Sequence, residues 1–191
     1  MRPSGIVLWG GIAAMIGGAL WVVWGLLSRA IPYAAGGPSY GGLLGFSAGL
    51  LLFAALLTLG GLVGLDALEA GSYWNLGRVG FYTAGVGLLA LALAAVFLLF
   101  GSEALLWLLA PGGSLAVVVG LVLYGVATLR AGVLARWCGW ALIVVPPIAS
   151  FLNSKVFYGS IALFGVLWVA LGYVLWSRSG MPTGRQPPRV R

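Results

Sequence analysis

Four long segments without a single charge constrain the fold of this chain most strongly. They are Gly5–Leu27, Gly41–Leu65, Val79–Phe100 and Val156–Trp176. Each is close to the roughly 20 apolar residues that a helix needs to cross about 30 Å of hydrocarbon. Lipid offers no partners to backbone N–H and C=O groups, so such segments must be helical. The sequence therefore predicts an all-α, polytopic (multi-pass) transmembrane protein.

Two shorter apolar runs, Ser114–Leu129 and Trp137–Ser150, lie between the third and the last of these segments. The first gives about 24 Å of helix at about 1.5 Å per residue, slightly short but workable with its flanks. The second is long enough if it begins at Gly132 and if Arg136 extends its guanidinium to the interface. We therefore predict six transmembrane helices within residues 1–176, forming one domain.

Two segments are predicted to lie outside the spans. Residues 103–110 are expected to form a short interfacial helix on the outer side, with Trp107 as its anchor. Pro111-Gly112-Gly113 is expected to end this helix before the fourth span begins. Residues 177–191 are rich in arginine and proline and have little to bury, so we expect a disordered basic tail on the cytoplasmic side.

The distribution of basic residues predicts the orientation. With six spans and a cytoplasmic N-terminus, the outer side holds only Arg29 and Lys155. The inner side holds all the others, namely Arg2, Arg78, Arg130, Arg136, Arg178, Arg185, Arg189 and Arg191. This bias agrees with the positive-inside rule. It predicts a cytoplasmic (inner) membrane protein, a cell membrane location, with both termini in the cytoplasm.

The inventory of reactive side chains disfavours an enzyme. Charged residues make up 7% of the chain, there is no histidine, and the acidic residues are only Asp66, Glu69 and Glu103. Cys138 is the only cysteine, which leaves no intramolecular disulfide or thiolate metal site, so it is expected to be a packing residue. We expect no catalytic site, no metal and no cofactor. The basic residues form no binding face, so nucleic acid is not an expected partner.

Small residues recur at intervals that favour close helix packing. They comprise Gly10, Ala14 and Gly18 in the first span and Gly41, Gly45, Gly49, Gly60 and Gly64 in the second. Small residues at such spacing let two backbones approach closely inside lipid. The favoured interpretation is packing of the first helix on the second. Self-association, or docking on another membrane subunit, is the alternative.

Two groups of polar or aromatic residues are interpreted from their expected depth. Trp21 is expected in the outer aromatic belt, whereas Trp168 lies deeper and is expected to pack in the core. Asp66 and Glu69 lie on one helical face just beyond the second apolar run, within reach of Arg78. A solvated ion pair at the membrane boundary is the favoured interpretation. A buried carboxylate pair would instead indicate proton or cation coupling.

Pro146 and Pro147 interrupt the fifth span and predict a candidate ligand pocket. Their missing N–H groups free the carbonyls of Leu142 and Ile143, which must face protein or a wet cavity. Residues expected to supply polar groups at similar depth are Ser47, Ser114, Asn153, Tyr158 and Ser160. The alternative is a kinked helix whose neighbours fill the gap.

Function is predicted only as a class. The favoured class is an accessory or packing subunit of a membrane assembly, with lipids, other membrane subunits or a second copy of the chain as partners. The alternative is a binder or transporter of a small neutral lipophilic molecule, using the outer-leaflet pocket beside Pro146-Pro147. A tightly filled core with an apolar, small-residue outer surface would favour the subunit. An open, polar-lined cavity would favour the binder.

Overall fold

The computed structural model describes residues 3–27, 40–69, 75–100, 103–155 and 161–179. Within these residues the chain forms six α-helices and no strand. The helices are α1 (Pro3–Leu27), α3 (Tyr40–Glu69), α4 (Asn75–Leu99), α5 (Glu103–Ala131), α6 (Arg136–Lys155) and α7 (Ile161–Ser179). This confirms an all-α, polytopic protein. Of the described helices, five are long and apolar enough to cross a membrane, and the apolar part of α6 is shorter.

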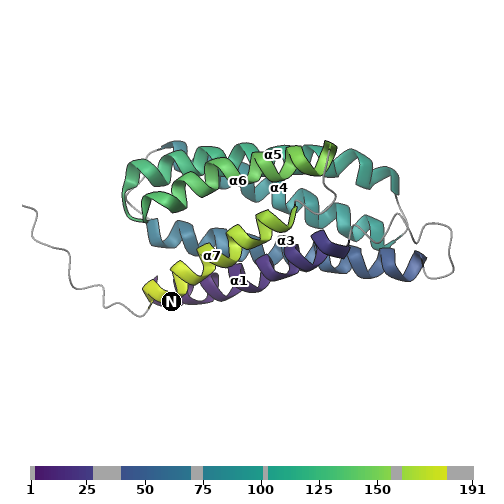
Figure 1. Ribbon diagram of the computed structural model, residues 1–191, viewed down its shortest axis with the longest axis horizontal. Coiled ribbons are helices and arrows are strands. Elements are labelled where there is room, and N and C mark those ends of the chain that lie inside the picture. The colour runs from purple at the N-terminus through teal and green to yellow at the C-terminus, as the bar shows by residue number, and fades with distance from the viewer. Residues whose placement is uncertain (1–2, 28–39, 70–74, 101–102, 156–160, 180–191) are drawn as a thin grey trace, which may run out of the picture.

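Consecutive helices run in opposite directions and close into a ring (Figure 1). Figure 1 shows α5 and α6 along one long edge of the bundle and α1 and α7 along the other. The most extensive contacts join α4 to α5, α1 to α7 and α1 to α3, whereas α6 meets α7 only sparsely. Among the neighbouring helices of the ring, α6 and α7 thus have the least extensive interface.

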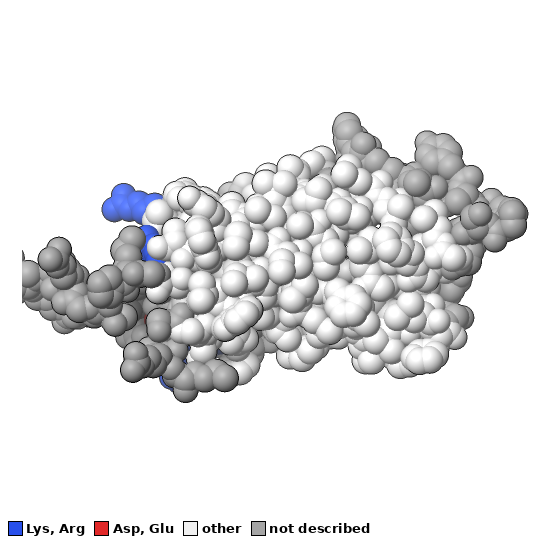
Figure 2. Space-filling view, turned by 90° about the horizontal axis from the view of Figure 1, so that it is seen from below, with Lys and Arg blue, Asp and Glu red and all other residues white. Residues whose placement is uncertain are grey.

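The described arginines gather at one end of the bundle. Arg78 and Arg136 lie at the starts of α4 and α6, while Arg130 and Arg178 lie near the ends of α5 and α7. Because the helices alternate in direction, these positions share one end, which we call the arginine end. On the face shown in Figure 2, the basic side chains lie at one end and the long flank carries none. This arrangement suits a bundle whose flank meets lipid.

Glycines spaced seven residues apart bring two pairs of helices into backbone contact. On α4 and α5, a methyl group added to Gly87 would lie 2.7 Å from the carbonyl oxygen of Gly113, and one added to Gly120 would lie 2.2 Å from the Ala84 nitrogen. On α1 and α7, Gly18 faces Gly165 in the same way, with 2.5 Å to its carbonyl oxygen. No larger residue fits at these points without separating the helices.

The predicted packing of the first two spans is correct for part of the glycine set. A methyl group on Gly10 would lie 2.5 Å from the Cα of Gly64, and one on Gly61 would lie 2.7 Å from the Cβ of Ala14. Gly60 also faces α1, through Ala13. Gly18, however, packs against α7 and not against α3, because α1 is held between these two helices.

The predicted close contact at Gly45 and Gly49 is wrong within this chain. A methyl group at either position would meet nothing within 4 Å, and the same holds for Gly42. The surroundings of Gly41 lie outside the described side chains. The two halves of α3 therefore differ, since the half near the arginine end packs its glycines against α1 and the other half leaves them open.

Three predicted boundaries are wrong. The segment 103–110 is not a separate interfacial helix, because α5 continues through Pro111. Gly113 packs against α4 in the manner of the other close contacts instead of ending the helix. Gly132, expected to begin the fifth span, lies in the turn before α6 with a φ of 64°. Part of the expected tail is helical, since α7 extends to Ser179; residues 180–191 lie outside the described part.

The interior is filled mainly by apolar side chains. Trp168 and Cys138 are buried as expected. Trp21 faces the protein interior and not lipid, because the residue is 2% exposed and its Nε1 donates to the Thr58 hydroxyl at 3.0 Å. The pairing with Thr58 on α3 explains this burial, since a tryptophan N–H inside an apolar core needs an acceptor.

Candidate functional site

An open row of glycines on α3 is the first candidate site. We call it the α3 glycine face, and it consists of Gly42, Gly45 and Gly49, with the exposed rings of Phe46 and Phe53 beside it. The missing side chains leave a strip of open space along this part of the helix. In lipid, such a strip can accept the ridge of another helix, because close backbone approach gains dispersion contacts.

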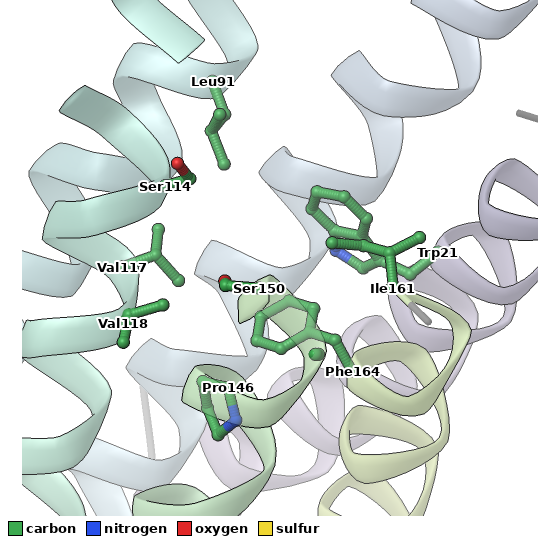
Figure 3. A pocket seen from close by; sticks show the side chains of 10 residues that line it. Trp21, Leu91, Ser114, Val117, Val118, Pro146, Ser150, Ile161 and Phe164 are labelled. Carbon is green, nitrogen blue, oxygen red and sulfur yellow. The ribbon is translucent and has the colours of Figure 1, made fainter. Parts of the chain in front are cut away.

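A small cavity next to Pro146 is the second candidate site. It has a volume of about 40 Å³ and lies between α5, α6, α7 and the aromatic side of α1. Figure 3 shows Ser114 and Val117 on one side and Trp21 and Phe164 across from them, with Pro146 at one end. The lining is almost wholly apolar. A water molecule needs about 10–15 Å³ of such space, so the cavity is large enough for a few waters at most and too small for a lipophilic ligand.

The structure brings together only part of the predicted pocket set. Pro146 and Ser114 line the cavity, whereas Pro147, Leu142, Ile143 and Ser47 do not. The side chains of Leu142 and Ile143 instead face Gly125 on α5, which places this stretch against protein. Asn153, Tyr158 and Ser160 fall outside the described side chains.

The serine hydroxyls are engaged within their own helices. Ser114 donates to the Pro111 carbonyl at 2.9 Å, and Ser47 donates to the Leu44 carbonyl at 2.8 Å. Helix α6 is also continuous through both prolines. The expected break with converging donors is therefore replaced by an intact helix beside a small apolar cavity.

An open groove between α6 and α7 is the third candidate site. It has a volume of about 330 Å³ and is lined only by apolar or aromatic residues, among them Trp137, Ala141, Leu163 and Ala170. Its size falls at the lower end of the range of about 300–1,000 Å³ that is typical of ligand pockets. The sparse contact between α6 and α7 leaves this groove open, and it can hold an acyl chain or a similar apolar group.

A buried polar cluster at the arginine end was not predicted. Glu69, the last residue of α3, is 0% exposed, which contradicts the expected solvated ion pair for this residue. Thr128 on α5 lies with its hydroxyl 3.2 Å from Glu69 Oε2, and the Tyr124 side chain interacts with the same carboxyl group. Asp66 is partly exposed and interacts with Arg78, as expected for a boundary ion pair.

One sequence signal for this cluster existed. Tyr124 and Thr128 lie four residues apart in an apolar span and therefore on one helical face. Their contact with Glu69 crosses the interior of the ring from α5 to α3, which are not neighbours in it, and spacing within one helix cannot reveal such a contact. No family model, curated protein or solved structure matches this chain. The geometry of these sites therefore provides the observations on which a proposed function can rest.

Proposed function

We propose that this chain is an accessory or packing subunit of a membrane assembly, which docks a partner transmembrane helix on the α3 glycine face. The observation that carries the proposal is the open space at Gly42, Gly45 and Gly49. The other half of α3 uses Gly61 and Gly64 for close contact with α1. The half with the α3 glycine face thus carries the same kind of glycine spacing, and no described residue packs against that face.

The filled interior supports the same proposal. The cavity beside Pro146 is small and almost entirely apolar, and the described core contains large buried side chains such as Trp168 and Tyr124. A protein that carries a ligand through its centre needs a larger passage lined by some polar groups. A subunit needs instead a rigid body and an outer surface of small residues.

The proposal is tested by steric blocking of the α3 glycine face. The Cβ of a leucine at Gly45 or Gly49 would meet no described atom within 4 Å, so both substitutions are expected to fill the strip and to leave the fold of the isolated protein intact. The matched control is Gly112→Leu on α5, because a methyl group at Gly112 also meets nothing within 4 Å. Native electrophoresis and affinity purification from the native membrane measure the assembly.

The expected result is loss of the larger assembly in both α3 variants and its retention in Gly112→Leu. Co-expression of two differently tagged copies distinguishes self-association from docking on another subunit. The proposal fails if both α3 variants migrate and co-purify with the same proteins as the parent, because the glycine strip would then meet only lipid.

A second candidate function, supported by the α6–α7 groove, is binding or transport of a small neutral lipophilic molecule. The groove is large enough for an apolar chain and includes Ala141 and Ala170, two small residues whose enlargement would fill it. Ala170→Phe is expected to remove bound lipophile detected by mass spectrometry, whereas Val86→Phe on the exposed surface of α4 is the control. Equal retention of lipophile in both variants would contradict binding in the groove.

A further inference from the structure

The position of Glu69 is unusual for an acidic residue in an apolar bundle. It is fully buried, and its Oε1 accepts no hydrogen bond from the described residues by strict geometry. No described lysine or arginine forms an ion pair with it. Ionisable residues buried inside a membrane domain are costly and commonly mark a functional site.

The charged and titratable groups around Glu69 come from four other helices. On its own helix Asp66 is one turn away, and on α5 the Tyr124 side chain interacts with it. Cys138 on α6 is within electrostatic reach. Of the arginines at this end, Arg78 on α4 interacts with Asp66, and Arg178 on α7 donates to the Val133 carbonyl; Arg130 and Arg136 form no described ion pair with Glu69. No described group of α1 acts on this site. The described environment thus supplies Glu69 with hydroxyls and a second acid, and with no paired cation.

The hydrogen-bond inventory of Thr128 indicates where a proton must lie. Its Oγ1 is 3.0 Å from the Tyr124 carbonyl oxygen and 3.2 Å from Glu69 Oε2. A threonine hydroxyl has one proton to donate, and a carbonyl oxygen can only accept. When Thr128 donates to Tyr124, as helical threonines commonly do four residues back, its oxygen can only accept from Glu69. In that arrangement the carboxyl group carries the proton of the contact, whereas an ionised Glu69 would require Thr128 to divide its one proton between two acceptors.

The length of the contact agrees with this assignment. A hydroxyl that donates to an ionised carboxylate typically lies about 2.5–2.7 Å from it. The observed 3.2 Å is longer than such a charge-assisted contact. A protonated Glu69 has one donor for Thr128 and one carbonyl oxygen that faces the buried Tyr124 side chain. Protonated Glu69 thereby satisfies the hydrogen-bonding groups of the cluster without a buried charge.

We propose that Glu69 is a proton-binding site of the membrane domain, protonated in the packed bundle and held between α3 and α5 by Thr128 and Tyr124. Its place in the last turn of α3, at the arginine end, keeps the proton close to the aqueous face. Release of the proton leaves a buried negative charge near Asp66, without a paired cation among the described residues. This inference does not depend on the α3 glycine face.

The composition of the chain allows a direct measurement. Glu69 and Glu103 are its only glutamates, so Glu103→Gln protein grown with carboxyl-¹³C glutamate reports Glu69 alone in infrared spectra. The expected spectrum of reconstituted protein shows the C=O stretch of a carboxylic acid near neutral pH. This band gives way to carboxylate bands as the pH is raised from about 5 to about 9. Asp66→Asn is the control and should keep the band.

Carboxylate bands at every pH in this range would overturn the proposal. Carboxylate bands that shift when sodium replaces choline would identify a cation site and would overturn it as well. A second measurement uses a lipophilic carbodiimide, which modifies protonated carboxyl groups in membranes. Mass spectrometry should find the adduct on Glu69 and its loss in Glu69→Gln; an adduct only on Asp66 would contradict the assignment.

Discussion

Gly120→Ala gives the sharpest test of the packing described here, because it adds a single methyl group at the tightest point between α4 and α5. The new Cβ would lie 2.2 Å from the Ala84 nitrogen and 2.7 Å from the Ala84 Cα. Non-bonded heavy atoms prefer about 3.5 Å or more. The two helices must therefore separate locally by about 1 Å, since both colliding atoms belong to backbone and cannot rotate away.

The energetic cost follows from the lost dispersion contacts. Each pair of contacting heavy atoms contributes about 0.15 kcal/mol of dispersion energy. A gap of about 1 Å removes between about a quarter and a half of this energy for each affected pair. If roughly 50 atom pairs along the seam are affected, the loss is about 2–4 kcal/mol. This is at the upper end of the range of about 1–3 kcal/mol for overpacked cores. We expect Gly120→Ala to lower the free energy of unfolding by this amount.

The matched control is Gly49→Ala, the same chemical change at an open position of α3. It is expected to leave the free energy of unfolding unchanged or to raise it by up to about 1 kcal/mol, because alanine favours helix over glycine. Reversible unfolding in mixed micelles, followed by circular dichroism, measures both variants. If Gly120→Ala and Gly49→Ala agree within about 0.5 kcal/mol, the close contact of α4 with α5 is refuted.

Three further predictions concern other parts of the bundle. Trp21→Phe should cost about 1 kcal/mol or more in unfolding free energy, because it removes the buried hydrogen bond to Thr58; an unchanged stability would mean that this bond contributes nothing. Replacement of Pro146 and Pro147 by alanine should leave the protein at least as stable in the same assay, since two helix hydrogen bonds are restored. In a Cys138→Ala background, cysteines introduced at positions 37 and 153 should be labelled from outside intact cells and those at 75, 133 and 185 only after permeabilisation; external labelling at 185 would contradict the orientation with both ends inside.

The helices were predictable because the hydrocarbon imposes a length on uncharged segments. All six expected apolar segments correspond to helices among the described residues. Their ends were less predictable, as the region around Pro111 demonstrates. A proline followed by two glycines stops a helix in water, but Gly113 packs against α4, and lipid makes breaking the helix costly. Inside the membrane, helix packing therefore outweighs the local tendency of proline and glycine to end a helix.

The partners of individual residues could not be predicted from spacing alone. Gly45 and Gly60 lie on the same helix and in similar sequence surroundings, yet one faces open space and the other faces α1. In a soluble protein, polar residues mark the outward side of a helix. Here both sides are apolar, so composition does not distinguish lipid from protein. The burial of Glu69 was missed for a related reason. Thr128 lies 59 residues away on α5, and only the folded bundle brings it to Glu69.

The open glycines of α3 have an energetic consequence that supports a partner outside the chain. Each glycine in a helix costs about 0.5–1 kcal/mol relative to alanine. At Gly120 this cost is offset by a contact with Ala84 that no larger residue permits, whereas Gly42, Gly45 and Gly49 have no such contact with the described residues. Alanine would fit at all three positions and would stabilise the isolated helix. In the proposed assembly, contact with a partner helix would supply the missing compensation, because glycine lets a second backbone approach closely.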